Sequence, residues 1–203
     1  MPNFVIFSVK KGFSPLTKAV STLRKPGRWG FKLKIHADEI VSLGGSELAG
    51  ELKATSADHL LHASDAGIKA MAENGVVSTL LPTTAFCLRE PFARAREMID
   101  AGCAVALATD FNPGSGFTFS VPLMLGLAVI YMHMTAEEAI TALTLNGAAA
   151  VGRADRIGSI EVGKQADLTI LQYPSYKFLP YHTGVNIVEK VIKKGELVHT
   201  VSV

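Results

Sequence analysis

Two residues of the metal-ligand type, His36 and Asp110, each follow a short apolar stretch that is predicted to form a β-strand. Imidazole nitrogens and carboxylate oxygens are donors that hold Zn²⁺ or Fe²⁺. A catalytic metal takes three or four such protein ligands, leaves one position for water, and lowers the pKa of that water toward neutrality. The pair therefore indicates metal-assisted hydrolysis, with His36 and Asp110 supplying part of the ligand set.

A lone histidine at a strand end is more often a hydrogen-bonded structural residue than a ligand, so this prediction depends on its neighbours. Glu39 and His59 occupy strand-end positions that match those of His36 and Asp110. Independent structural roles would not require this alignment, which favours a single functional site. His62 matches no such position, and we expect it to be structural.

The segment that follows Asp110 reads Asp-Phe-Asn-Pro-Gly-Ser-Gly and adds three candidate binding residues. Asn112 and Ser115 bring polar side chains, and Gly114 lets the backbone approach a ligand closely. An ordinary Asn-Pro-Gly turn accounts for the same residues without any ligand. The spacing alone does not decide between the two.

Strands and helices that alternate with short connections must position these residues. The near-continuous apolar strands predict a parallel sheet covered on both faces, in which functional groups project from the C-terminal strand ends. We expect four such strands, which end at His36, His59, Thr83 and Asp110. The expected strands cover residues 31–35, 57–61, 76–81 and 104–109, and the helices cover residues 46–52, 65–74 and 91–101.

The pattern changes after Asp110. Helices are expected over residues 118–131 and 136–145, the second with a capping box of Thr135 and Glu138 and a stop at Asn146-Gly147. From residue 157 the chain is β-like, over residues 158–162, 166–171 and 189–198, with a hairpin turn at Lys194-Gly195. We therefore divide the chain into an atypical segment 1–30, a partial barrel 31–155 and strands of a small β domain, 156–203.

Composition limits the classes of protein that fit. Of the 203 residues, 48% are hydrophobic and 19% charged, and the net charge is +2, so neither a nucleic acid nor a strongly acidic molecule is the expected partner. The apolar run 120–134 falls short of the roughly 20 residues that span a membrane. Cys87 and Cys103 show no disulfide or metal spacing, which predicts a cytoplasmic protein.

The first 30 residues differ from the rest because they are basic and contain no Asp or Glu. A strand is conceivable at residues 3–9, but prolines and glycines interrupt the remainder. An organellar transit peptide has this composition. Our preferred hypothesis is that the segment is partly misread in the gene and that the protein extends upstream, which the genomic DNA would test.

Four motifs together resemble the imidazolonepropionases of the amidohydrolase superfamily, over about residues 30–198. A fifth stretch, Gly158–Leu168, is typical of the whole superfamily. The motifs are Lys34-Ile-His-Ala-Asp-Glu39, Ser56-Ala-Asp-His-Leu60, Leu81-Pro-Thr-Thr84 and Ala108-Thr-Asp-Phe-Asn-Pro-Gly-Ser115. The resemblance implies the C-terminal half of a metal-dependent-hydrolase (β/α)₈ TIM-like barrel, followed by the C-terminal strands of a small β-sandwich domain.

The resemblance also implies a reaction and a role for each residue. A zinc- or iron-dependent hydrolase of histidine degradation would open 4-imidazolone-5-propanoate to N-formimidoyl-L-glutamate, commonly as a homodimer. His36 and Asp110 would bind the metal, and Asp110 would accept a proton from its water. His59 would stabilise the oxyanion, and Glu39 would orient the substrate. Substrate contacts would come from Glu39, Asn112, Gly114 and Ser115.

The chain departs from this family in one respect. The family's remaining metal ligands, a His-x-His pair on the first barrel strand, are absent from the sequence, and no histidine precedes His36. We therefore expect this chain to be truncated and inactive alone. Two other interpretations remain: a ring aminohydrolase, which the Asp110–Ser115 loop disfavours, and a non-catalytic remnant or one half of a complementing assembly.

Overall fold

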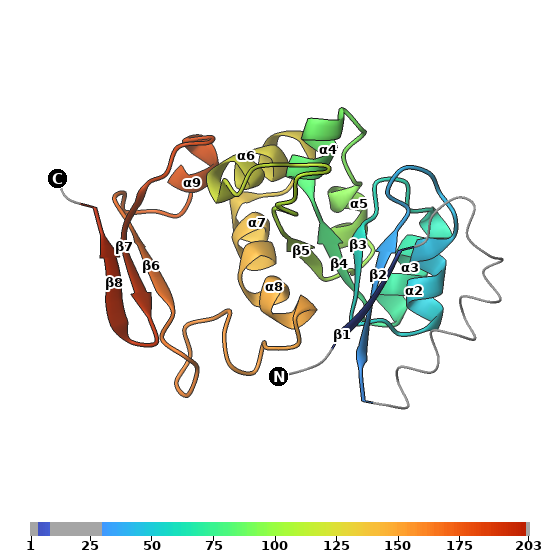
Figure 1. The fold of residues 1–203 in the computed structure, drawn as a ribbon, viewed down its shortest axis with the longest axis horizontal. Coiled ribbons are helices and arrows are strands. Elements are labelled where there is room, and N and C mark those ends of the chain that lie inside the picture. The colour runs from blue at the N-terminus through green and yellow to red at the C-terminus, as the bar shows by residue number, and fades with distance from the viewer. Residues whose placement is uncertain (1–3, 9–29, 202–203) are drawn as a thin grey trace.

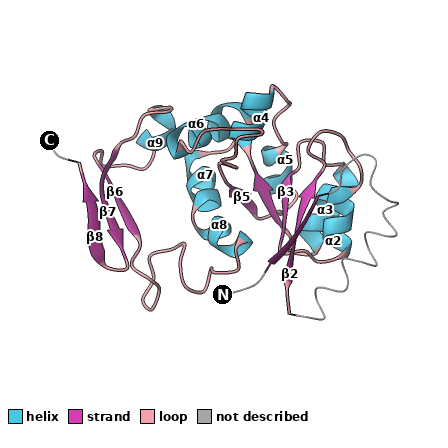
Figure 2. Cartoon of the chain, in the orientation of Figure 1, coloured by secondary structure: helices cyan, strands magenta, loops and turns pink. Residues whose placement is uncertain are grey.

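The computed structural model describes residues 4–8 and 30–201. Predictions for most of the first 30 residues, including the basic run and its prolines, lie outside these ranges. Within them, a five-stranded sheet with flanking helices is followed by a three-stranded antiparallel sheet at the far end of the molecule (Figures 1 and 2). No helix in the described ranges is long and apolar enough to cross a membrane.

The larger sheet has the order β1-β2-β3-β4-β5, and every neighbouring pair is parallel. The prediction of a parallel sheet with four strands is confirmed, and the strand considered at residues 3–9 is present at residues 4–8 and adds a fifth. The strands are β1 (Phe4–Ser8), β2 (Lys32–Ala37), β3 (Ser56–His59), β4 (Val77–Leu80) and β5 (Val105–Leu107).

The register separates the two faces of this sheet. Ile35 and Ala57 lie opposite each other on one face and belong to the main apolar core, which α2 (Gly45–Glu51) and α3 (Asp65–Glu73) help to form. On the other face, His36, Asp58 and Thr79 form a polar row across β2, β3 and β4. Side chains alternate between faces along a strand, so the polar row follows from the sequence of each strand.

The two helices between β4 and β5 differ from the prediction. Residues 91–94 are not helical, and α5 (Ala95–Asp100) begins four residues later than expected. The helix α4 (Pro82–Leu88) was not expected, and it begins at the proline directly after the predicted strand 76–81. Proline suits a first helical turn because its φ is preset and no N–H is needed there. Thr83 therefore lies in a helix and not at a strand end.

The helices after β5 are α6 (Val121–Tyr131), α7 (Ala136–Leu143) and α8 (Leu145–Ala150). The capping box at α7 is confirmed, with Thr135 and Glu138 bonded reciprocally. The stop at Asn146-Gly147 was wrong, since both residues lie inside α8. Asn146 Nδ2 donates to the carbonyl of Val105 at 2.8 Å, which holds α8 against β5.

The C-terminal strands are β6 (Leu168–Leu171), β7 (Val188–Lys193) and β8 (Glu196–Thr200), and all pairings are antiparallel. Lys194 and Gly195 have φ values of 53° and 84°, as a type I′ hairpin turn requires, so the predicted turn is confirmed. Residues 158–162 form no strand, and the one-turn helix α9 (Phe178–Tyr181) was not predicted. A division near residue 155 stays a prediction.

Candidate active site

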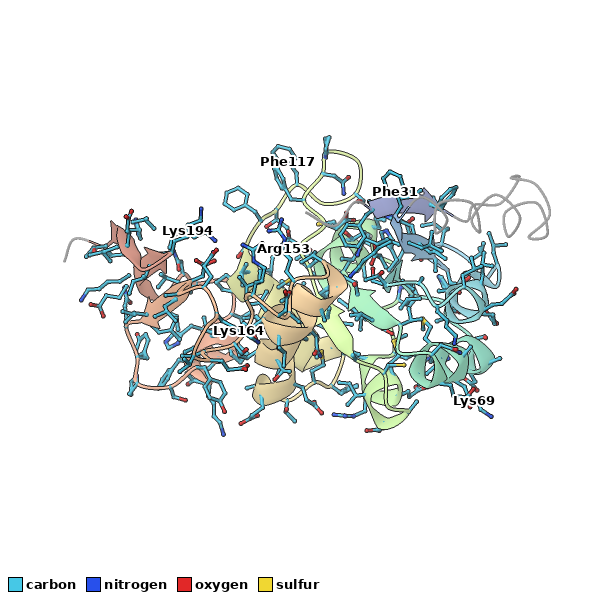
Figure 3. The ribbon with its side chains drawn as sticks, turned by 90° about the horizontal axis from the view of Figure 1, so that it is seen from below. Phe31, Lys69, Phe117, Arg153, Lys164 and Lys194 are labelled. Atoms are coloured by element: carbon cyan, nitrogen blue, oxygen red, sulfur yellow. The ribbon has the colours of Figure 1, made fainter. Side chains whose placement is uncertain are left out.

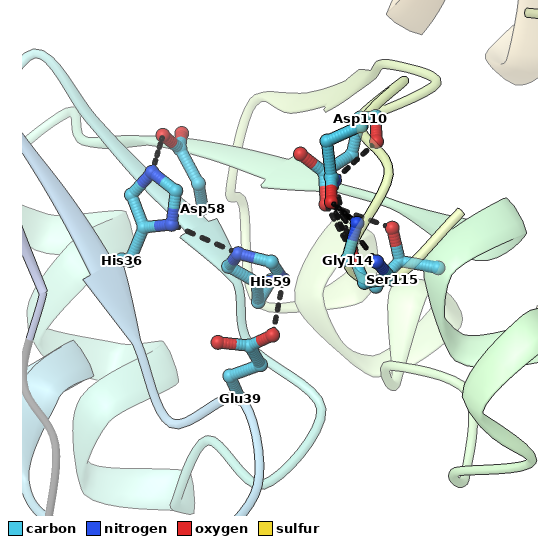
Figure 4. A network of polar contacts seen from close by, with 9 residues as sticks. His36, Glu39, Asp58, His59, Asp110, Gly114 and Ser115 are labelled. Atoms are coloured by element: carbon cyan, nitrogen blue, oxygen red, sulfur yellow. Dashed lines mark hydrogen bonds and ion pairs between the residues drawn. The ribbon is translucent and has the colours of Figure 1, made fainter. Parts of the chain in front are cut away.

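Three of the predicted site residues, His36, His59 and Glu39, lie together at the C-terminal ends of β2 and β3. The Nδ1 atom of His36 is 2.9 Å from Nε2 of His59, and their ring centroids are 4.8 Å apart. Glu39 Oε1 is 3.8 Å from Nδ1 of His59, which is close enough for charge interaction but too long for a hydrogen bond. Figure 4 shows the row Asp58–His36–His59–Glu39.

A change of backbone conformation turns His59 toward His36. Strand alternation puts His59 opposite Ala37, on the face away from His36. His59 and Leu60 have φ values of 78° and 62°, which ends the strand and lets the imidazole reach His36. Asp38 and Asp110 also have positive φ values, 48° and 50°. Such conformations are unfavourable for residues other than glycine and often occur at functional sites.

Burial determines the charge state of His59, which is 2% exposed. Removal from water lowers the pKa of His59, while the carboxylate of Glu39 opposes this shift and the His36 ring adds to it. A lowered pKa keeps the imidazole neutral at pH 7. His59 can therefore exchange hydrogen bonds with a reacting group without holding a fixed positive charge.

The other predicted residues form a second group around Asp110. Thr84 Oγ1 donates to Asp110 Oδ2 at 2.8 Å, and Ser115 Oγ lies 3.4 Å from the same oxygen. The Asn112 side chain bonds to the backbone of its own loop. Its Nδ2 donates to the Asp110 carbonyl at 2.7 Å. Its Oδ1 accepts from the N–H of Gly114 at 2.8 Å and from the N–H of Ser115 at 2.9 Å. The Asn112 amide thus shapes the loop that presents Asp110.

Exposed aromatic rings surround this loop. Phe111 packs against Phe117 and Phe119 with centroid distances of 4.7 and 5.7 Å. Phe117 and Phe119 are 75% and 78% exposed, and Figure 3 shows Phe117 on a loop that projects from the body of the molecule. The candidate site is therefore bordered by apolar surface.

One cavity of about 240 Å³ connects the two groups, because His36 and Asp110 both line it. Lys34, Asp58 and Thr79 contribute from the polar face of the sheet, and α8 closes one side with Ala150. Among the described residues, no hydrogen bond or ion pair joins the two groups directly. In the described part of the chain, no three His, Cys, Asp or Glu side chains converge as a metal site would require. The donor types suit zinc or iron, but the set is incomplete.

Sequence reasoning missed three polar residues near the predicted ones: Asp58, Lys34 and Thr84. Asp58 pairs in register with His36, and its carboxylate lies 4.0 Å from His36 Nε2. Lys34 forms an ion pair with Asp58 at 3.5 Å. The sequence could have indicated Asp58 because it directly precedes the candidate His59. Side chains alternate between the two faces of a strand, however, which suggested that only one of these adjacent residues could face the site.

Comparisons with known proteins show the family to which this chain belongs. A sequence model of the Amidohydrolase family matches residues 30–198, which is most of the chain. The chain belongs to the amidohydrolase family. The five parallel strands then correspond to the C-terminal part of the barrel that the resemblance implied. The separate antiparallel sheet corresponds to the C-terminal strands of the small β domain.

Within the amidohydrolase family, the chain is similar to several imidazolonepropionases. It is 68% identical over 194 residues to the imidazolonepropionase of Clostridium tetani, an alignment that covers 96% of this chain and extends into residues 1–30. It is 70% identical over 168 residues to that of Bacteroides thetaiotaomicron, covering 83% of this chain. The chain spans 45% and 40% of these two relatives, respectively.

Solved amidohydrolase structures share the fold at much lower identity. An adenosine deaminase from Xanthomonas campestris with bound zinc has a TM-score of 0.79 and 23% identity, covering 96% of this chain and 51% of its own. The guanine deaminase of E. coli has a TM-score of 0.74 and 18% identity, covering 93% and 53%. These likenesses establish the architecture and do not favour deaminase activity for this chain.

Proposed function

We propose that this chain forms one side of the active site of an imidazolonepropionase. The reaction is metal-dependent hydrolysis of the cyclic amide of 4-imidazolone-5-propanoate to N-formimidoyl-L-glutamate, a step of histidine degradation. The observation that carries the proposal is that His36 and Asp110, one from each group of predicted residues, line one cavity in a chain that is 68–70% identical to two imidazolonepropionases.

In this proposal, His36 and Asp110 hold a divalent metal, zinc or iron, together with ligands from beyond the described residues. The bound metal supplies an acidified water and polarises the carbonyl group of the ring. Asp110 accepts a proton through its carboxylate, which Thr84 orients by the 2.8 Å hydrogen bond to Oδ2. The Oδ1 atom of Asp110 remains available for a second contact.

His59 is proposed to stabilise the negative charge that develops on the substrate oxygen. Its neutral imidazole can donate a hydrogen bond to that oxygen, provided that the bond with His36 is exchanged. Glu39 lies beside the other ring nitrogen of His59 and is proposed to bind and orient the substrate ring. The two residues share one approach to the substrate because they follow neighbouring strands.

The Asp110–Ser115 loop is proposed to bind the substrate through Asn112, Gly114 and Ser115. Because the Asn112 amide already bonds to its own loop, its contribution is to hold the backbone and the Ser115 hydroxyl in place. Two further proposals accompany the activity: a homodimer and a cytoplasmic location. Cys87 and Cys103 are both free, which suits a reducing compartment.

The test combines metal analysis with turnover. The purified 203-residue chain is mixed with the N-terminal half of the Clostridium tetani relative and with zinc, and loss of 4-imidazolone-5-propanoate is followed by mass spectrometry. We expect turnover in the mixture and none with the chain alone, because the described residues supply too few ligands.

The variants His36→Ala and Asp110→Ala should abolish turnover in the mixture and reduce bound zinc, whereas the control His62→Ala should retain both. His62 is a suitable control because it lies close to the site in sequence and has no predicted role in binding or chemistry. A mixture that forms a complex and binds zinc but leaves the substrate intact would contradict the proposed reaction. Release of ammonia from a purine or pyrimidine would support the aminohydrolase alternative.

A further inference from the structure

The hydroxyl group of Thr79 is buried and has no hydrogen-bond partner among the described residues. Thr79 is 7% exposed and lines the cavity from β4. On one side it lies opposite Asp58 of β3, and on the other it lies opposite Ala106 of β5, whose methyl group offers no hydrogen bond. A hydroxyl that is buried without a partner is unfavourable, so we expect this group to bind a molecule in the cavity.

Asp58 brings a second polar atom to the same cavity. Its Oδ1 accepts from Ser56 Oγ at 2.8 Å and lies 3.5 Å from Lys34 Nζ. In the described part of the chain, its Oδ2 accepts no hydrogen bond, and the 4.0 Å to His36 Nε2 is too long for one (Figure 4). The Asp58 side chain is 10% exposed, so this carboxylate oxygen requires a donor.

The charges around the cavity favour water over an ion. Lys34 lies beside Asp58 and neutralises it, so a cation would meet the lysine charge and an anion would meet the carboxylate. The Thr79 hydroxyl donates or accepts, whereas the carboxylate only accepts, so a neutral molecule that can also donate suits both. The cavity of about 240 Å³ has room for several waters, each of which occupies about 30 Å³ in the liquid.

We propose that Thr79 Oγ1 and Asp58 Oδ2 bind an ordered water molecule between β3 and β4. The two side chains face one cavity from strands about 4.8 Å apart, yet they do not bond to each other. One water bridges such a gap and gives both atoms a partner. Lys34 extends the network to α8 because its Nζ donates to the carbonyl of Ala150 at 3.3 Å.

The water would complete a buried polar network in the wall of the cavity that His36 and Asp110 also line. The network requires neither a metal nor a substrate, so it stands or fails separately from the proposed function.

The first test is urea unfolding of Thr79→Val in the full 203-residue chain. Valine keeps the shape of threonine and removes the hydroxyl group. If the hydroxyl bonds to the proposed water, the equilibrium constant of unfolding should rise about 2- to 10-fold. A midpoint that stays the same or increases would overturn the proposal, because removing a buried hydroxyl without a partner is neutral or stabilising. The matched control is Thr169→Val, which is exposed in β6 and should leave the midpoint unchanged.

The second test is a high-resolution crystal structure of the parent chain and of Thr79→Val. We expect a water about 2.7–3.2 Å from both Thr79 Oγ1 and Asp58 Oδ2 in the parent, and its loss in the variant. A direct bond between Thr79 and Asp58, or no water at this position, would overturn the proposal.

A third test repeats Thr79→Val in the background Lys34→Met/Asp58→Leu, which removes both charges together. The water then has no carboxylate partner, so Thr79→Val should change the equilibrium constant of unfolding less than about 2-fold. An effect as large as in the parent background would contradict the bridge. If that background does not fold, the first two tests decide.

Discussion

Replacing Asp38 by alanine should destabilise the protein more than any other change of an acidic residue near the site. Asp38 is 1% exposed and lies between His36 and Glu39 in the sequence. Its Oδ1 accepts from the N–H groups of Leu43 and Gly45 at 2.8 and 3.1 Å. Its Oδ2 accepts from the N–H and hydroxyl groups of Ser46 at 2.9 and 2.6 Å.

The magnitude follows from the donors that the change leaves without an acceptor. Two of the three N–H groups, those of Gly45 and Ser46, belong to the first turn of α2, which has no partner for them within the helix. A buried donor that loses its partner costs about 1–3 kcal/mol, and breaking a buried charged network costs about 3–5 kcal/mol. Removing the buried carboxylate recovers part of its desolvation, so we expect a loss of about 3–5 kcal/mol.

Urea unfolding followed by circular dichroism measures this loss as a change in the free energy of unfolding at constant slope. The matched control is Asp65→Ala, because Asp65 also begins a helix but its side chain is 90% exposed and pairs with Arg94 at the surface. The control should lose no more than about 1 kcal/mol. The reasoning would be refuted if Asp38→Ala lost less than about 1 kcal/mol or no more than the control.

Two further predictions concern packing and pH. Gly67→Ala places a Cβ 2.0 Å from Ser46 Oγ, so it should destabilise the protein by about 1–3 kcal/mol. The control is Gly147→Ala, whose Cβ meets its nearest atom at 3.4 Å and which should change the stability by less than about 1 kcal/mol. Thermal unfolding of the two variants measures the difference. Lys193 lowers the pKa of Asp167 to about 2, below the value near 3.9 of an unfolded chain. The stabilisation from Asp167 should therefore be present above about pH 4 and be lost as the pH falls toward 2. In a plot of the urea midpoint against pH, Asp167→Asn should flatten the slope between about pH 2 and pH 4.

The parallel sheet was predictable because hydrophobic pattern and turn residues agree along most of the chain. The errors occur where tertiary contacts outweigh local signals. Asn146 and Gly147 resemble a helix stop, yet the bond from Asn146 to Val105 keeps both inside α8. Thr83 and Thr84 are poor helix formers, but their hydroxyl groups bond to Thr109 and Asp110, which holds α4 at the end of β5.

The composition of the candidate site was predictable from residue types, whereas its internal contacts were not. Spacing placed His36, His59 and Asp110 at one edge of the sheet, and the structure confirms that placement. Alternation along β3 could not reveal that both Asp58 and His59 reach His36, because that depends on the positive φ at His59. The roles assigned to these residues remain predictions.

The hydrogen bond between His36 and His59 has a consequence for the proposed chemistry. One nitrogen of this pair donates and the other accepts, so neither Nδ1 of His36 nor Nε2 of His59 is free while the 2.9 Å contact persists. In the proposed function His59 donates to the substrate oxygen, and it would do so from this nitrogen only after losing the contact, at a cost of about 0.5–1.5 kcal/mol. Any group that His36 binds through Nδ1 would release His59 in the same way. The proposed roles of the two histidines are therefore coupled.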